Sequence, residues 1–195
     1  MIKKENVLFL LLGMALFYIS TFLDKSVSLL FQTIKIPFLD LIFSIITNFG
    51  VVLVFLLFMP AIMVCKKDKK TFKLLFLTFF LSFVLSFVLK LTVLRQRPTD
   101  TLYYPIVNII NYSFPSTHSM VIFALLPLLL SYLPKQKAFW LSFTFLVGFS
   151  RIYLNFHYLS DVVFGAVFGY FIGRAIIEFY VNKPLKNEKQ KSRNK

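Results

Sequence analysis

Residues 71–94 read TFKLLFLTFFLSFVLSFVLKLTVL, a stretch in which Lys73 and Lys90 are the only charged side chains. It is longer than the about 20 helical residues that cross the hydrocarbon layer of a bilayer. Its Phe, Leu and Val residues lie on every side of a helix, so the apolar surface faces lipid as well as protein. The stretch predicts a transmembrane helix.

Similar segments lie on both sides of it. They are Val7–Leu23, Ile45–Cys65, Ser119–Leu133, Ala138–Asn155 and Leu159–Val181, of which the first and third are short. No small-x-small cleavage site follows the first segment, so we expect an uncleaved helix rather than a signal peptide. The stretch at 26–47 alternates polar and apolar residues and is typical of an interfacial amphipathic segment. The fold class predicted is all-α, a polytopic membrane protein with six transmembrane helices.

The composition agrees with a membrane protein. Of the 195 residues, 58% are hydrophobic and 15% charged, and the mean hydropathy is +0.76, which is high for a soluble domain. We expect one six-helix domain over residues 1–181 and a basic, disordered tail at 182–195. The lone Cys65 excludes an internal disulfide and a cysteine-based zinc site.

The net charge of +14 comes from clusters between the apolar segments and in the tail. This is how topology signals are distributed, so a nucleic-acid partner is not expected. The clusters are Lys3–Lys4, Lys66–Lys70, Lys135–Lys137 and Lys183–Lys195. With six spans they share one side, which predicts cytoplasmic termini and outward-facing loops at 24–44, 95–118 and 156–160.

Most of the unusual polar residues lie at the outward ends of four spans. They are Lys90 with Arg97, Ser116 with Thr117 and His118, Ser150 with Arg151, and His157 with Asp161. Cations near hydrocarbon are costly unless they are paired or used. Asp161 cannot neutralise all of them, so we expect an anionic ligand, and Arg and Lys together suit phosphate.

His157 and Asp161 are four residues apart. The carboxylate could therefore reach one imidazole nitrogen and leave the other free for nucleophilic attack, while His118 protonates a leaving oxygen. A metal site is the competing interpretation. The surrounding cations would repel a divalent ion, so no metal or other cofactor is expected.

Three motifs in this order resemble the type 2 phosphatidic acid phosphatase family, which shares its site with vanadium haloperoxidases. They are Lys90-LTVLRQ-Arg97-Pro98, Pro115-Ser116-Thr117-His118, and Ser150-Arg151-IYLNF-His157-YLS-Asp161. The resemblance implies that His157 forms a phosphohistidine, Asp161 orients it, and His118 serves as acid and base. It also implies that Lys90, Arg97, Ser116, Thr117 and Arg151 hold the phosphoryl oxygens.

Some residues have plainer interpretations. Thr117 replaces the usual glycine of the second motif, which leaves the substrate preference open. Ser150 is a further candidate, although its hydroxyl could simply bond a backbone carbonyl. The remaining expectations are these: Arg95 snorkels to the interface, Asp24 and Asp40 are solvated, Arg174 pairs with Glu178, Tyr103, Tyr104 and Tyr112 form an interfacial belt or a gate, and Gly165, Gly169 and Gly173 permit close helix packing within the monomer.

The sequence therefore predicts a metal-independent lipid phosphatase of a bacterial cell membrane. Its expected substrates are undecaprenyl diphosphate or phosphatidylglycerophosphate, with phosphatidate and sphingoid phosphates as further candidates. The alternatives are a vanadate-dependent haloperoxidase and a catalytically silent protein that binds anionic lipid. The sequence does not determine the oligomeric state.

Overall fold

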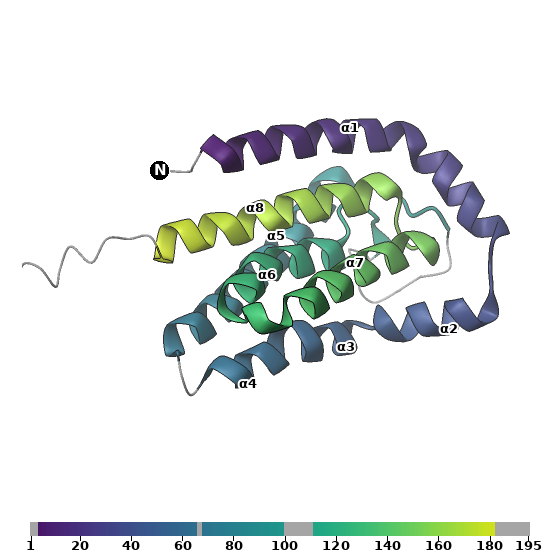
Figure 1. Ribbon diagram of the computed structural model, residues 1–195. Helices are drawn as coiled ribbons and strands as arrows, with labels where there is room; N and C mark the ends of the chain where they lie inside the picture. Colours follow the sequence, from purple (N-terminus) through teal and green to yellow (C-terminus); the bar gives the residue numbers. More distant parts are fainter. Residues whose placement is uncertain (1–3, 66–67, 100–110, 182–195) are drawn as a thin grey trace, which may run out of the picture.

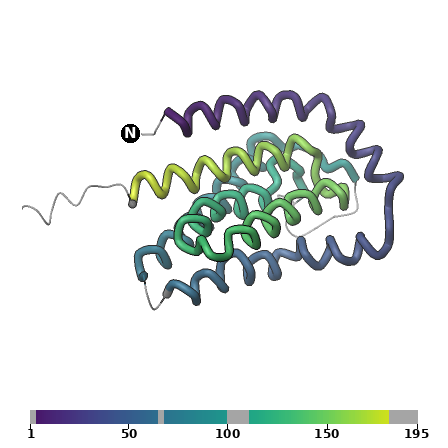
Figure 2. The backbone as a smooth tube through the Cα atoms, in the orientation of Figure 1, coloured from purple at the N-terminus to yellow at the C-terminus, as the bar shows by residue number. Residues whose placement is uncertain are grey.

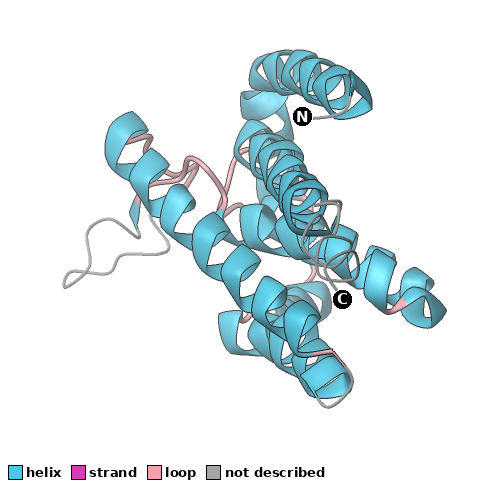
Figure 3. Cartoon of the chain, turned by 90° about the vertical axis from the view of Figure 1, so that its left-hand side faces the viewer, coloured by secondary structure: helices cyan, strands magenta, loops and turns pink. Residues whose placement is uncertain are grey.

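The computed structural model describes residues 4–65, 68–99 and 111–181. Within those ranges every regular element is a helix (Figure 3), so the prediction of an all-α chain is confirmed there. The elements are α1 (Lys4–Thr33), α2 (Pro37–Ile46), α3 (Phe49–Leu53), a π-helical turn (Val54–Phe58), α4 (Met59–Cys65), α5 (Lys69–Val93), α6 (Thr117–Tyr132), a 3-10 turn (Pro134–Gln136), α7 (Lys137–Tyr153) and α8 (Leu159–Val181). The predictions for Tyr103, Tyr104 and the 182–195 tail fall outside the described residues.

Three helices, α1, α5 and α8, are long and apolar enough to cross a membrane. Two bent pairs raise the number to at most five spans: α2 with α3 and α4, bent by 47°, and α6 with α7, bent by 119°. Six separate spans are not reached because α6 has 16 residues, or about 24 Å of helix, against a hydrocarbon layer of about 30 Å. Most of α6 is buried in the bundle, so protein rather than lipid surrounds it.

The helices form a bundle in which α8 lies between α1 and α6 (Figure 1). α2, α3 and α4 follow one another along the side of the bundle opposite α1, as the tube in Figure 2 shows. α1 begins and α8 ends at the same end of the bundle, where α4 also ends and α5 begins. The last residues of α5 and α7 and the first of α6 and α8 lie toward the other end.

Glycines in α8 explain how closely it packs on α6. A Cβ atom added to Gly169 would lie 2.2 Å from the carbonyl oxygen of Met120, and one added to Gly173 would lie 2.1 Å from that of Ala124. Only glycine allows backbones to approach this closely. The expected packing of these glycines within the monomer is therefore confirmed.

α1 is longer than the predicted span at 7–23 and continues to Thr33. No helix breaker occurs before Pro37, and the polar side chains of Asp24 and Ser28 find partners in the bundle instead of ending the helix. The amphipathic segment predicted at 26–47 is consequently divided between the end of α1 and α2.

A polar stripe on α5 directs Lys90 into the bundle. Thr78, Ser82, Ser86 and Lys90 recur every four residues and are all buried, as the helical period requires of residues on one face. Large exposed apolar residues such as Phe80 and Val88 cover the outer face. The position of Lys90 in this stripe, rather than its charge, fixes the direction of its side chain.

Candidate active site

Lys90 lies in the last turn of α5 and is almost completely buried. Its ammonium donates hydrogen bonds to the backbone carbonyls of Tyr112 at 2.5 Å and Ser113 at 3.4 Å. The cation is held by neutral carbonyls, so its charge remains available to an anion. Tyr112, for which an interfacial or gating role was expected, contributes its backbone to this site.

Thr117 and His118 open α6, and Ser116 is the residue that caps it. The Ser116 hydroxyl accepts hydrogen bonds from the backbone N–H and hydroxyl of Ser119 at 3.4 and 3.1 Å. This is the usual function of serine at a helix start. Ser116 is therefore buried behind the site, whereas Thr117 and His118 line the cavity. The Thr117 hydroxyl accepts a hydrogen bond from Ser86.

The His118 ring is fixed by the connection between α2 and α3. The Thr47 backbone hydrogen-bonds to the imidazole, and Phe49 packs edge-on against it with ring centroids 5.1 Å apart. Nε2 is buried and has no hydrogen-bond partner within the part of the chain that the structure describes. One nitrogen is thus occupied and the other is left for proton transfer.

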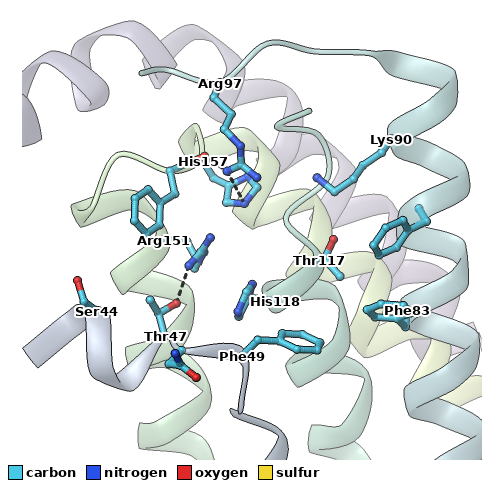
Figure 4. Close-up of a pocket in the computed structure, with 13 residues that line it drawn as sticks. Ser44, Thr47, Phe49, Phe83, Lys90, Arg97, Thr117, His118, Arg151 and His157 are labelled. Atoms are coloured by element: carbon cyan, nitrogen blue, oxygen red, sulfur yellow. Dashed lines mark hydrogen bonds between the residues drawn. The ribbon is translucent and has the colours of Figure 1, made fainter. Parts of the chain in front are cut away.

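Arg151 and Arg97 reach the same place from different segments. The Arg151 guanidinium donates to the Thr47 hydroxyl at 2.8 Å and lies over the Phe156 ring. Arg97, just after α5, donates to the Phe156 carbonyl at 2.5 Å, and the same nitrogen is 3.4 Å from His157 Nε2. In the close-up (Figure 4), the Arg97 guanidinium points toward His157, whereas that of Arg151 lies between His157 and Thr47 and bonds to Thr47.

His157 lies in the short connection between α7 and α8. The turn depends on Asn155, which adopts a left-handed conformation with φ of 59°, a conformation that asparagine tolerates better than most residues. Asn155 and Ser28 of α1 exchange hydrogen bonds at 2.9 and 3.1 Å. α1 therefore stabilises the turn that presents His157.

The expected direct bond between Asp161 and His157 is not formed. Their nearest atoms, Asp161 Oδ2 and His157 Nδ1, are 3.7 Å apart, beyond hydrogen-bond range. Ser113 lies between them, and its hydroxyl hydrogen-bonds to Asp161 Oδ2 and lies 3.4 Å from Nδ1. The carboxylate also accepts from the backbone N–H of Tyr158 at 2.9 Å. Nε2, the other ring nitrogen, faces Arg97.

The expectations for Arg95 and Asp24 were wrong. Arg95 does not snorkel; its two terminal nitrogens contact Asp161 and Asp24 at 2.8 and 2.7 Å. Asp24 is 5% exposed rather than solvated. These contacts join residues far apart in the chain, so no local pattern in the sequence could reveal them.

Three other predicted residues lie outside the site, and only Ser150 makes a purely local contact. The Ser150 hydroxyl donates to the Val147 carbonyl at 2.7 Å, which is the plainer of its two interpretations. Arg174 and Glu178 both contact Asn6 of α1, so this asparagine lies within the pair that was expected to be purely local.

The candidate site is a cavity of about 560 Å³. The candidate residues that line it are Lys90, Arg97, Thr117, His118, Arg151 and His157, and Phe49, Phe83 and Phe87 supply an apolar wall. Burial lowers the pKa of the His157 imidazole well below its usual range, and the charge of Arg97 lowers it further. The ring is therefore neutral, as a nucleophile must be.

The chemistry of the cavity suits a phosphate group. Three cations converge on a space that also contains a neutral imidazole and a second histidine with an open nitrogen. Among the described residues, no three His, Cys, Asp or Glu side chains are grouped so that they could hold a metal ion. The arrangement has the groups needed to bind a phosphate ester and to accept its phosphoryl group on nitrogen as the ester oxygen leaves.

Sequence reasoning missed Ser113 and Thr47. Ser113 lies just before the Pro115–His118 segment, and a hydroxyl so close to a motif is a signal that could have been examined. Thr47 is distant from every motif in sequence, and only the packing of α2 against α7 brings it to Arg151.

The chain is similar to known proteins in sequence and in fold. The family model described as PAP2 superfamily matches residues 71–184, which is more than half of the chain. The Bacitracin transport permease protein BcrC of Bacillus licheniformis is 40% identical over 60 residues, a match that covers 31% of this chain and 30% of that protein.

Two solved structures are similar. A transmembrane PAP2 type phosphatidylglycerolphosphate phosphatase from Bacillus subtilis has a TM-score of 0.71 and 24% identity, and the match covers 93% of this chain and 97% of that one. LpxE from Aquifex aeolicus has a TM-score of 0.64 and 28% identity, with 80% and 95% covered. The chain thus matches the family model in sequence and shares its fold with two structures of membrane proteins. The chain belongs to the PAP2 superfamily.

Proposed function

We propose that this protein is a metal-independent membrane phosphatase that hydrolyses a lipid phosphate or diphosphate through a phosphohistidine at His157. One observation carries the proposal: a single cavity holds three cations, a neutral His157, and His118 with an open Nε2. Binding alone would need the cations but not two oriented histidines.

In the first step, the substrate phosphate lies among Lys90, Arg97 and Arg151. His157 Nε2 attacks phosphorus, so a P–N bond forms as the bond to the leaving oxygen breaks. His118, protonated at Nε2, donates that proton to the leaving oxygen and becomes neutral. The cations stabilise the charge that spreads over the equatorial oxygens.

In the second step, water attacks the phosphohistidine. His118, now deprotonated, accepts the water's proton, and the P–N bond breaks to release inorganic phosphate. Ser113 and Asp161 remain behind Nδ1 throughout and stabilise the ring while it carries positive charge.

We infer an outward-facing site in a bacterial cell membrane, with both termini in the cytoplasm and six crossings in which α6 and α7 count separately. Lys69 and Lys70 open α5 at the end of the bundle where α1 begins, and Lys135 lines a cavity at that end together with Asp68, which supports this orientation. The burial of α6 supports a crossing shorter than the lipid layer. The phenylalanine wall beside the cations suits a phosphate attached to a lipid chain.

The substrates we expect are undecaprenyl diphosphate and phosphatidylglycerophosphate. The name of the similar Bacillus subtilis protein supports the second. The test is release of inorganic phosphate from each lipid, and from phosphatidate, by purified protein in detergent with EDTA. Wild type should release phosphate and His157→Ala should not, whereas Thr92→Val, on the exposed face of α5, should match wild type. Lipid binding without release by folded wild-type protein would favour the silent-binder alternative instead.

A further inference from the structure

A partly buried charge cluster, in which the Arg95 side chain is 30% exposed, connects α1 to the carboxylate behind His157. We define the Arg95 cluster as Arg95, Asp24, Ser160 and Asp161. Arg95 Nη1 donates to Asp161 at 2.8 Å and to the Ser160 hydroxyl at 2.7 Å, and Nη2 donates to Asp24 at 2.7 Å. Asp24 also accepts from the backbone N–H and hydroxyl of Ser160 at 2.8 and 2.5 Å.

The charges in this cluster do not balance. One guanidinium lies between two carboxylates whose side chains are 7% and 0% exposed, so the cluster carries about one net negative charge when both are ionised. A single arginine would pair completely with a single carboxylate. Asp24 therefore competes with Asp161 for the same cation.

This competition matters for His157. The ring becomes positively charged when its Nε2 binds phosphorus, and Lys90, Arg97 and Arg151 on the cavity side all oppose that charge. Negative charge can stabilise it from the Nδ1 side, where Ser113 and Asp161 lie. If Arg95 neutralised Asp161 completely, this stabilisation would be weakened.

We propose that Asp24 and Arg95 are positioning residues for the phosphatase reaction: Arg95 fixes the Asp161 carboxylate, and Asp24 draws charge from Arg95 so that Asp161 stays negative toward His157. The proposal rests on the proposed function. It assigns the first helix a place in the chemistry, although α1 lies outside the three motifs.

The first test separates charge from shape at Asp24. Asn has the shape of Asp without its charge, whereas Glu keeps the charge and changes the shape. If the charge of Asp24 keeps Asp161 negative, Asp24→Asn should lower kcat by about tenfold, which is in the range of coupling between residues in contact. Asp24→Glu should retain more activity than Asp24→Asn. KM should stay near wild type, because Asp24 does not line the cavity. Asp40→Asn removes the same charge from α2 and is the matched control.

The second test restores the charge balance. Arg95→Gln removes the group that fixes the Asp161 carboxylate, so it should lower kcat. It also leaves two buried carboxylates without their cation, so it should lower the thermal unfolding temperature. In the double variant Asp24→Asn/Arg95→Gln, Asp161 is again the one net negative charge. The double variant should therefore be faster than Asp24→Asn alone, by about fivefold or more. Ser160→Ala is a milder change that keeps every charge. It removes the hydroxyl that bonds to both Arg95 and Asp24, so the contact between those two residues loosens, and kcat should fall while KM stays constant.

The outcomes are distinct. Each of three results would overturn the inference. The first is a kcat for Asp24→Asn within about twofold of wild type, and the second is a higher kcat for Asp24→Asn than for Asp24→Glu. The third is a double variant in which the losses of the two single variants simply multiply. Full wild-type kcat in Ser160→Ala would do the same, so the inference stays testable if Asp24→Asn does not fold. If wild type itself releases no phosphate from any of the three lipids, the proposed function fails, and this inference fails with it.

Discussion

Ser113 occupies the position where a direct contact between Asp161 and His157 was expected. Replacing it with alanine removes the hydroxyl that hydrogen-bonds to Asp161 Oδ2 and lies 3.4 Å from His157 Nδ1. Asp161 keeps its bonds to Arg95 and to the Tyr158 backbone. The carboxylate should therefore stay in place, while the ring loses its only short polar connection to it among these contacts.

The magnitude follows from that geometry. A hydrogen bond to a charged group contributes about 1.5–3 kcal/mol, and each ~1.4 kcal/mol is a factor of about ten in rate. Ser113→Ala should thus lower kcat by about 10- to 100-fold. KM should change little, because Ser113 does not line the cavity, and Asp161 at 3.7 Å can replace the hydroxyl only after the ring moves.

Steady-state phosphate release from the preferred lipid measures both constants, and thermal unfolding in detergent verifies the fold. Ser131→Ala, which loses a hydroxyl bonded to a backbone carbonyl within α6, is the matched control. Wild-type kcat in a folded Ser113→Ala protein would show that Asp161 acts on His157 without this hydroxyl and would refute the reasoning.

Three further predictions concern titration and stability. Because burial and Arg97 lower the pKa of His157, the ring stays neutral until the pH falls below the usual histidine pKa, and the acid limb of kcat/KM due to this group should lie below pH ~6.5. In Arg97→Gln the pKa of His157 measured by NMR should be higher than in wild type, and an unchanged pKa would contradict the role of Arg97. Gly169→Ala places a Cβ 2.2 Å from the Met120 carbonyl oxygen and should lower the free energy of unfolding by about 1–3 kcal/mol. Thermal unfolding measures this loss, and an unfolding temperature equal to that of wild type would contradict the prediction. Asp68 caps α5 and accepts hydrogen bonds from Lys70 and Thr71, chiefly from the Thr71 hydroxyl, which lower its pKa. Asp68→Ala should therefore lower the free energy of unfolding by about 1 kcal/mol, a contribution that is present above the pKa of the unfolded chain and lost as the pH falls through the lowered pKa of the folded protein. Identical unfolding temperatures for wild type and variant at neutral pH would contradict this.

The sequence predicted the helices well where the apolar runs are long, because a run such as 71–94 has no other stable environment than a bilayer. It was less accurate at their ends. α1 continues past Leu23 because Asp24 and Ser28, which look like helix-ending polar residues, have partners on distant segments. The number of spans was not confirmed because α6 and α7 are short and reverse sharply between them.

The spacing of the motifs places Lys90, His118, Arg151 and His157 at neighbouring helix ends, and all four line one cavity. The sequence could not predict how each side chain is used. The Ser116 hydroxyl caps a helix, Ser113 lies between Asp161 and His157, and Arg95 bridges two carboxylates. Each of these depends on packing between segments that are separated in the sequence.

The central claim is that His157 becomes covalently phosphorylated. His118→Ala removes the group that activates water, and p-nitrophenyl phosphate has a leaving group that needs no proton, so together they should let the intermediate accumulate. Mass spectrometry of peptides prepared at alkaline pH should find an acid-labile phosphoryl group on His157, absent from His118→Ala/His157→Ala. Turnover of that substrate by a folded His157→Ala protein, or a phosphoryl group on another residue, would contradict the account.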